Sequence, residues 1–164
     1  MNASLSCCFI GHRKIEESEK LINDLQLIIE DLIVNKGVSR FMFGSKSQFN
    51  DLCYDIVSEL KNKYAHIVII YVRSMYENLT PYYEEYLYEI YDETIYPDCV
   101  KNSNRLSYIK RNEYMINNSD FCVFYYEENY KPRNYKGVSR NSGTKIALDY
   151  AKQKKKSIIV LSKN

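Results

Sequence analysis

The sequence predicts an α/β fold with a mostly parallel central sheet of about five strands. Short apolar runs rich in β-branched and aromatic residues alternate along the chain with longer segments whose apolar residues recur at helical spacing. Strands that are joined through helices of this length run parallel, with right-handed crossovers. With 164 residues, of which 45% are hydrophobic, the chain fits one domain, residues 1–164.

Five segments are expected to be strands because each is a short apolar run bounded by glycine or polar residues: 5–10, 40–43, 67–72, 121–126 and 157–161. The run 67–72 is unbroken by polar residues, which is typical of a strand buried on both faces of a parallel sheet. We therefore expect this strand near the centre of the sheet.

The segments between these runs are expected to be helices: 15–35, 49–60, 105–118 and 144–153. The segment 82–96, rich in tyrosine and glutamate, is interpreted as a helix plus an irregular connection that ends at Pro97. Residues 127–141 form a long polar loop. With helices on both faces of the sheet, the expected architecture is a single Rossmann-like three-layer domain.

Composition narrows the function classes. Twenty-three basic and 21 acidic side chains give a net charge of +2, so no uniformly basic face for a DNA backbone is indicated. Five cysteines, most of them in apolar runs without paired spacing, indicate buried thiols in a reducing compartment. No signal peptide and no apolar run long enough to span a bilayer is recognised, so we expect a cytoplasmic protein. The cysteine spacing does not indicate a zinc site, and we expect no metal and no cofactor.

The candidate site lies where strands end, because ligands of such sheets bind at the carboxyl edge. Three glycine-bearing turns meet there, and each combines a close backbone approach with donors suited to a phosphate. Their candidate ligand-binding residues are Gly11, His12 and Arg13, then Gly44, Ser45 and Lys46, and finally Ser142, Gly143 and Thr144. Arg111 and Asn112, on the helix before the fourth strand, are added as residues that reach the same edge.

Each motif also has a purely structural interpretation. Gly11 can be a turn glycine, Ser47 or Asn50 a simple helix cap, and Arg111 a solvated arginine. The convergence of three such turns on one sheet edge favours a ligand site. His12 is interpreted as a hydrogen-bond donor in preference to a general acid or base.

A family resemblance extends over nearly the whole chain. It is carried by Cys8-Phe9-Ile10-Gly11-His12-Arg13, Phe43-Gly44-Ser45 with Phe49-Asn50, Tyr108-Ile109-Lys110-Arg111-Asn112 with Met115-Ile116, Ser119-Asp120, and Ser142-Gly143-Thr144 with Ala147 and Tyr150-Ala151. Together these residues resemble the small YpsA-like branch of the SLOG superfamily. The superfamily includes DNA-processing protein A, the "lonely guy" phosphoribohydrolases and sensor domains of bacterial defence systems. The resemblance implies a Rossmann-like sheet that binds nucleotides or their derivatives through the residues above.

Two positions depart from the family pattern. Ala147 stands where the phosphoribohydrolases carry a glutamate, so an N-glycosidic bond would lack its usual acid or base. Asp149 does not replace it, because two residues further along a helix a side chain points about 200° away. Asn50 stands where the branch tends to have an acidic residue, which weakens a ribose-hydroxyl or metal role there.

Three functions from different classes stay open. The preferred hypothesis is a binding module that senses or sequesters a nucleotide or nucleotide-derived phosphorylated small molecule without catalysis, in bacterial or phage defence signalling. The alternative is a nucleoside-phosphate N-glycoside hydrolase that uses His12 and Glu127 or Glu128. The third is single-stranded DNA binding, for which the sequence shows no basic groove. The tyrosines of residues 82–96 favour a homodimer.

Overall fold

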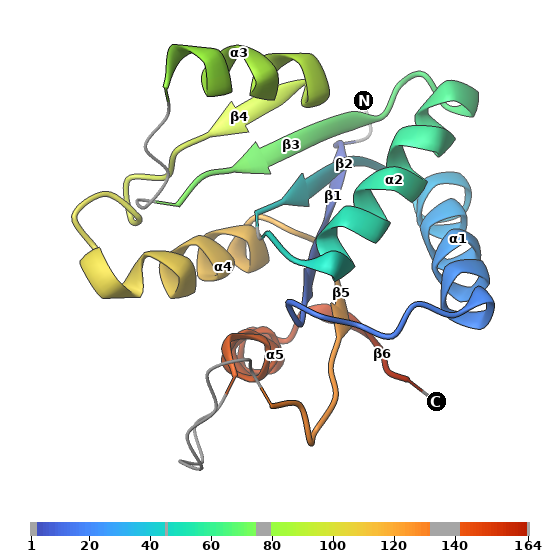
Figure 1. Cartoon of the computed structure of the whole chain (residues 1–164). Coiled ribbons are helices and arrows are strands. Elements are labelled where there is room, and N and C mark those ends of the chain that lie inside the picture. Colours follow the sequence, from blue (N-terminus) through green and yellow to red (C-terminus); the bar gives the residue numbers. More distant parts are fainter. Residues whose placement is uncertain (1–2, 45, 75–79, 132–141, 164) are drawn as a thin grey trace.

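The computed structural model describes residues 3–44, 46–74, 80–131 and 142–163. Over these residues the chain forms one six-stranded sheet with the strand order β4-β3-β2-β1-β5-β6, in which every neighbouring pair is parallel (Figure 1). The strands are β1 (Leu5–Gly11), β2 (Val38–Phe43), β3 (Val68–Val72), β4 (Glu93–Ile95), β5 (Phe121–Tyr125) and β6 (Ser157–Leu161). The α-helices are α1 (Glu19–Val34), α2 (Gln48–Lys63), α3 (Pro81–Ile90), α4 (Ser107–Asn117) and α5 (Gly143–Gln153).

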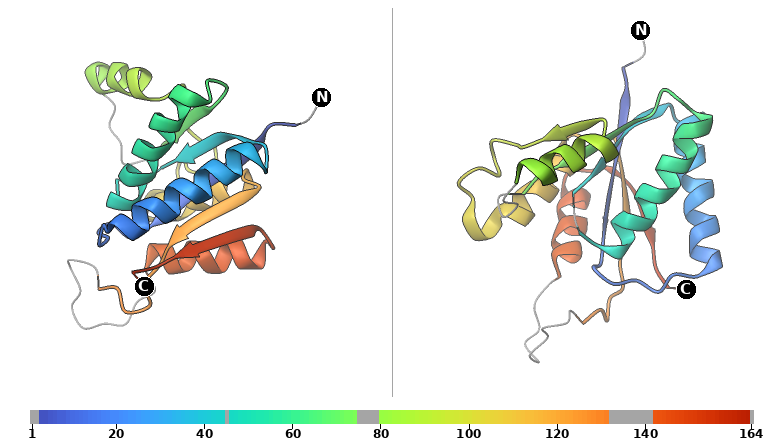
Figure 2. Two further views of the ribbon diagram at one scale, coloured as in Figure 1. Left: turned by 90° about the vertical axis from the view of Figure 1, so that its right-hand side faces the viewer. Right: turned by 45° about the horizontal axis from the view of Figure 1, so that its top comes forward.

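Helices cover both faces of the sheet, which confirms the Rossmann-like three-layer fold (Figure 1). Alternate side chains of a strand point to opposite faces, so β1 contributes Phe9 to one buried cluster and Cys8 and Ile10 to the other. The Phe9 cluster packs against α1 and α2, and the Cys8 cluster packs against α4 and α5. Figure 2 shows α3 near β4, at the opposite end of the sheet from β6.

The sheet differs from the expectation in two respects. It has six strands instead of about five, because residues 93–95, expected to belong to an irregular connection, pair with β3. The strand β3 lies second from the edge and not at the centre, although both of its faces are covered. An unbroken apolar run indicates only that both faces of a strand are buried. It does not indicate how many strands lie beyond it, and here the three-residue strand β4 forms the edge of the sheet.

Hydroxyl side chains fix the starts of four α-helices. Ser18, Ser47, Thr80 and Ser142 each accept a hydrogen bond from the backbone N–H three residues later, at the starts of α1, α2, α3 and α5. The cap of α3 is followed by Pro81 at the first helical position, a start signal that the sequence analysis overlooked. In front of α4 a 3₁₀ turn, Asn104–Leu106, takes the place of such a cap.

The cysteine prediction is confirmed for four of the five thiols: Cys7, Cys8, Cys53 and Cys122 are buried, and Cys99 is exposed. Burial is the main cause that raises the pKa of Cys7 and Cys53 well above 9.0. Within the described part of the chain, no helix combines the length and the apolar character needed to cross a membrane.

Candidate functional site

The strand order creates a branch point at the carboxyl edge, between β1 and β5. After β1 the chain passes to α1 on one face, and after β5 it passes to α5 on the other face (Figure 1). In open parallel sheets ligands bind in the crevice outside the carboxyl ends of such strands. The predicted residues after β1 and at the start of α5 therefore flank the position where the fold favours a ligand.

Gly11 has a packing role. It is the last residue of β1, and a Cβ atom on it would lie 2.3 Å from Cδ1 of Phe49, which is fully buried on α2. Only glycine lets α2 approach β1 this closely. Gly11 is therefore explained by packing alone. The next two residues along the chain are the predicted site residues His12 and Arg13.

His12 joins the exits of β1 and β5. Its ring is 2% exposed, its Nε2 accepts the backbone N–H of Glu127 at 2.9 Å, and it stacks on Tyr130 at 3.9 Å between ring centroids. Burial lowers the pKa of His12 below 6.5, against the opposing effects of the hydrogen bond and the charge of Glu127. An acceptor Nε2 places the proton of the neutral ring on Nδ1. His12 was expected to be a hydrogen-bond donor, but in its bond with the backbone N–H of Glu127 it is the acceptor.

Asn50 ties the carboxyl ends of β1 and β2 together. Its Oδ1 accepts the N–H of Gly44 at 3.2 Å, and its Nδ2 donates to the carbonyl oxygen of Phe9 at 3.1 Å. The side chain is 3% exposed. A carboxylate at this position could not donate to Phe9, which gives a physical reason for an amide here. The cap that the sequence analysis considered for this turn is made by Ser47.

Arg111 is buried at the exit of β2. It is 3% exposed, its Nη1 donates to the carbonyl oxygen of Gly44, and its guanidinium lies 5.2 Å from the ring centroid of Tyr108. A Cβ atom on Gly44 would approach Cδ of Arg111 to 2.8 Å. Gly44 therefore makes room for Arg111, and the structure brings two of the predicted site residues into direct contact.

The start of α5 is open on one side. Ser142 caps the helix by accepting the N–H of Lys145 at 3.1 Å, and Thr144 is 6% exposed. A Cβ atom on Gly143 would meet nothing within 4 Å. A small cavity between α4 and α5 is lined by Ile109, Asn112, Glu113, Gly143, Ile146, Ala147 and Tyr150. It brings Asn112 and Gly143 together, next to Ala147.

The remaining predicted residues are Ser45, Lys46 and Arg13. Ser45 lies outside the described residues. Lys46 is exposed, with its Nζ 5.5 Å from the ring of Tyr83. Arg13 is exposed, and its carbonyl oxygen accepts the N–H of Gln48 at 2.9 Å. The charged groups of Arg13 and Lys46 lie at the same sheet edge as Arg111. Neither forms an ion pair within the described part of the chain.

No candidate residue was predicted after β3, which ends at the same edge of the sheet. Arg73 follows the strand directly, and Ser74 and Ser107 are 1% and 0% exposed. A polar pair directly after a buried apolar strand is a signal that can identify such residues. No sequence signal marks Ser107, because only the packing of α4 buries it.

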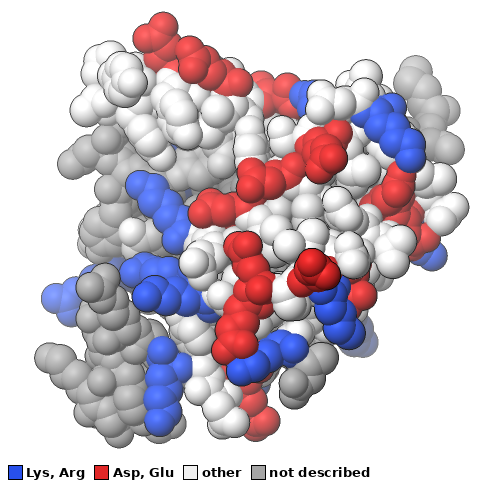
Figure 3. All heavy atoms as spheres, turned by 45° about the vertical axis from the view of Figure 1, so that its right-hand side comes forward, with Lys and Arg blue, Asp and Glu red and all other residues white. Residues whose placement is uncertain are grey.

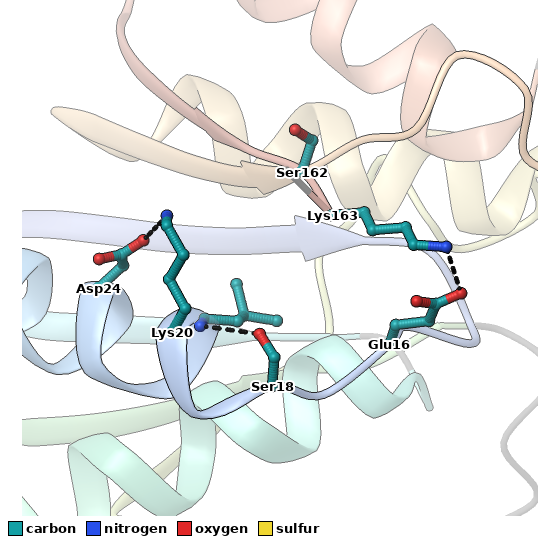
Figure 4. A pocket seen from close by; sticks show the side chains of 7 residues that line it. Glu16, Ser18, Lys20, Asp24, Ser162 and Lys163 are labelled. Atoms are coloured by element: carbon teal, nitrogen blue, oxygen red, sulfur yellow. Dashed lines mark hydrogen bonds and ion pairs between the residues drawn. The ribbon is translucent and has the colours of Figure 1, made fainter.

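A second hollow lies at the start of α1 and the end of β6, away from these residues (Figure 4). Its charged groups are already paired, Lys20 with Asp24 at 2.7 Å and Lys163 with Glu16 at 2.9 Å. Ser18 is occupied as the cap of α1. This hollow contains no predicted site residue and offers a ligand few unsatisfied groups.

The surface charge is mixed. On the face drawn in Figure 3, acidic side chains run across the middle and most lysines and arginines lie towards the lower left, so this face is not uniformly basic. Along α2 the acidic residues Asp51, Asp55 and Glu59 recur at intervals of four, so they share one side of the helix. Such a face repels a nucleic acid backbone.

Comparisons with known proteins support the fold. No protein-family model matches the chain, and no curated protein matches it. Among solved structures, the Moco carrier protein of Chlamydomonas rheinhardtii is similar, with a TM-score of 0.51 and 12% sequence identity. The similarity covers 99% of this chain and 79% of that protein. At this identity the likeness shows a shared α/β architecture.

Proposed function

We propose that the protein binds a nucleotide or nucleotide-derived phosphorylated small molecule at the carboxyl edge of the sheet, without catalysis. The observation that carries the proposal is the buried guanidinium of Arg111 at the exit of β2, held beside Gly44. A guanidinium has five donors in a planar fork that matches phosphate oxygens. It costs free energy to bury such a charge, and an anionic ligand at this edge offsets that cost.

The start of α5 supplies the complementary half of the proposed site. Backbone N–H groups at a helix start attract an anion, and the open space at Gly143 lets a phosphate approach them. The Asn112 side chain from α4 lines the neighbouring cavity. Arg13 and Lys46 add exposed positive charge at the same edge of the sheet.

The side chains argue against glycoside hydrolysis. Ala147 is 3% exposed and carries no carboxylate, and Nε2 of His12 is occupied by the N–H of Glu127. The carboxylate of Glu127 accepts from the hydroxyl of Tyr125 at 3.2 Å and from the N–H of Lys163. The similar solved structure is named a Moco carrier protein, which favours a binding role on this architecture.

The proposal includes a setting for this binding. The protein would sense or sequester a signalling nucleotide in the cytoplasm, as part of bacterial or phage defence, and would act as a homodimer. The tyrosine-rich segment offers a surface for the second subunit, because Tyr82, Tyr86 and Tyr88 of α3 are 82%, 47% and 64% exposed. Tyrosine is enriched at protein interfaces.

Calorimetric titration with the four ribonucleoside monophosphates and diphosphates tests the binding role. We expect the wild type to bind at least one of them, and Arg13→Ala to weaken it about tenfold, since a charge-assisted bond is worth roughly 1.5–3 kcal/mol. The matched control Lys36→Ala removes an exposed charge after α1, at the opposite edge, and should leave affinity unchanged. Release of free base from a monophosphate would establish the N-glycoside hydrolase instead. If Arg13→Ala and Lys36→Ala weakened binding equally, a site at Arg13 would be contradicted.

A further inference from the structure

Buried polar atoms without partners among the described residues occur at the exit of β3 and at the start of α4. They include Nε of Arg73 and Oγ of both Ser74 and Ser107, none of which has a hydrogen-bond partner among the residues that the structure describes. Ser74 is 1% and Ser107 0% exposed. Native proteins pair the great majority of buried polar atoms, because an unpaired one costs free energy. Three such donors in one region call for an explanation that the fold itself does not supply.

These residues adjoin the site already described. Ser74 comes two residues after Val72, which packs in the cluster covered by α4 and α5, so alternation directs Ser74 towards the same face. The β3–β4 ladder extends to Arg73, whose N–H donates to the carbonyl oxygen of Ile95 at 2.8 Å. Ser107 lies one helical turn before Arg111 on α4 and on the same side of the helix.

Arg73 adds a positive charge to this region that no ion pair within the described residues neutralises. The guanidinium of Arg73 lies 4.8 Å from the ring centroid of Tyr96, and Nζ of Lys101 lies 5.4 Å from the same ring. Within the described ranges Arg73 forms no ion pair, and Lys101 pairs only with the exposed Asp98 at 3.0 Å. A ring can attract both cations, but it does not cancel their charge.

We propose that Arg73, Ser74 and Ser107 form a second subsite of the pocket, which binds a second phosphoryl group of the ligand. All three offer donors, the guanidinium N–H and two hydroxyls, and a phosphoryl oxygen accepts from all of them. The ligand class is then a nucleotide with two phosphoryl groups, one at Arg111 and the start of α5 and one at this subsite. The inference rests on the proposed function for the site of the first phosphoryl group.

The test compares ribonucleoside monophosphates with the corresponding diphosphates by calorimetry, at one ionic strength. We expect the wild type to prefer the diphosphate, and the double variant Ser74→Ala, Ser107→Ala to lose about tenfold in diphosphate affinity. Its affinity for the monophosphate should stay unchanged, because the first phosphoryl group binds elsewhere. Arg13→Ala should instead weaken both ligands.

Thermal unfolding without ligand separates a binding role from a structural one. Ser74→Ala and Ser107→Ala should leave Tm unchanged or raise it, since each removes an unpartnered buried hydroxyl. The matched control Ser119→Ala should lower Tm, because Ser119 is also 2% exposed but donates to the carbonyl oxygen of Met115 at 2.6 Å. A drop in Tm for the double variant as large as that of the control would overturn the inference.

The two proposals fail in different ways. If Arg13→Ala weakens the monophosphate but the double variant keeps the full preference for diphosphate, the second subsite is wrong and the nucleotide site stands. If the wild type binds neither class of nucleotide, the proposed function is wrong and the second subsite is overturned with it.

Discussion

Glycine serves different purposes at three places along the carboxyl edge. At Gly11 and Gly44 a Cβ atom would collide with Phe49 and Arg111, so these glycines make packing possible. At Gly143 nothing lies within 4 Å of that position. From the sequence, all three are expected to be places where the backbone approaches a ligand. From the structure, only Gly143 has free space in which a phosphate can do so.

Gly143→Ala tests this distinction. Gly143 is the first residue of α5 and has no positive φ, so alanine fits and should raise the free energy of unfolding by up to about 1 kcal/mol. The same methyl group should weaken nucleotide binding, because it stands where a phosphate would approach the backbone. Urea denaturation and calorimetric titration measure the two effects separately.

Gly37→Ala is the matched control for that substitution. Gly37 follows α1 with a φ of +75°, so alanine there should lower the free energy of unfolding by roughly 1 kcal/mol. It should leave nucleotide affinity unchanged, since this glycine lies away from the carboxyl edge. If Gly143→Ala binds nucleotide as tightly as the wild type, the start of α5 is not part of the site.

At the scale of elements, apolar periodicity was a reliable guide. The expected strands 5–10 and 121–126 match β1 and β5 to within one residue, and 157–161 matches β6 at both ends. Apolar residues recur regularly in an element because one or both of its faces are buried, so the sequence reveals the buried elements best. The strand β4 has three residues, all half-buried, so it shows no apolar run. The first helix was expected to start at residue 15, but α1 starts after Ser18, whose side chain caps it.

His12 shows how one side chain connects two elements. It lies after β1, and its Nε2 accepts a hydrogen bond from Glu127 after β5, 115 residues away in the sequence. Its pKa is lowered below 6.5 because burial disfavours the charged ring. Between that lowered pKa and 6.5 the unfolded chain binds more protons than the folded one, so stability is complete above pH 6.5 and falls as the pH drops below it.

The predicted result is a free energy of unfolding that decreases as the pH falls from about 7.5 to about 5.5. His12→Gln keeps an acceptor for Glu127 but does not titrate, so the slope of stability against pH should become shallower in this range. Denaturant titrations at several pH values measure both slopes. Equal slopes for the wild type and His12→Gln would show that His12 is not held in its neutral form by the fold.

At the scale of the whole molecule, the sequence predicted the layers of the fold, and it places the candidate site at one edge of the sheet. Alternation of strands and helices implies parallel strands, and parallel strands deliver their exits to one edge. The order of the strands did not follow from this pattern, because crossover length does not determine on which side of β1 the strand β5 lies. The contact of Arg111 with Gly44, 67 residues apart, depends on that order.

The buried serines of the proposed second subsite show more sharply what the sequence cannot predict. Ser74 directly follows a buried strand, but no sequence pattern shows that its hydroxyl and that of Ser107 are buried without a partner among the described residues. Ser119 has the same burial but finds the carbonyl oxygen of Met115. Whether a buried hydroxyl has a partner is a property of the assembled molecule, so the sequence alone cannot distinguish these serines.

The central claim is that the carboxyl edge captures a phosphorylated nucleotide without altering it. The most direct measurement is mass spectrometry of the small molecules released when protein purified from cells is heat-denatured, with Arg13→Ala treated in parallel. We predict an intact nucleotide derivative from the wild type and its loss from Arg13→Ala. A wild-type protein that retains no such molecule, and that converts added nucleoside monophosphates to free base, would contradict the account.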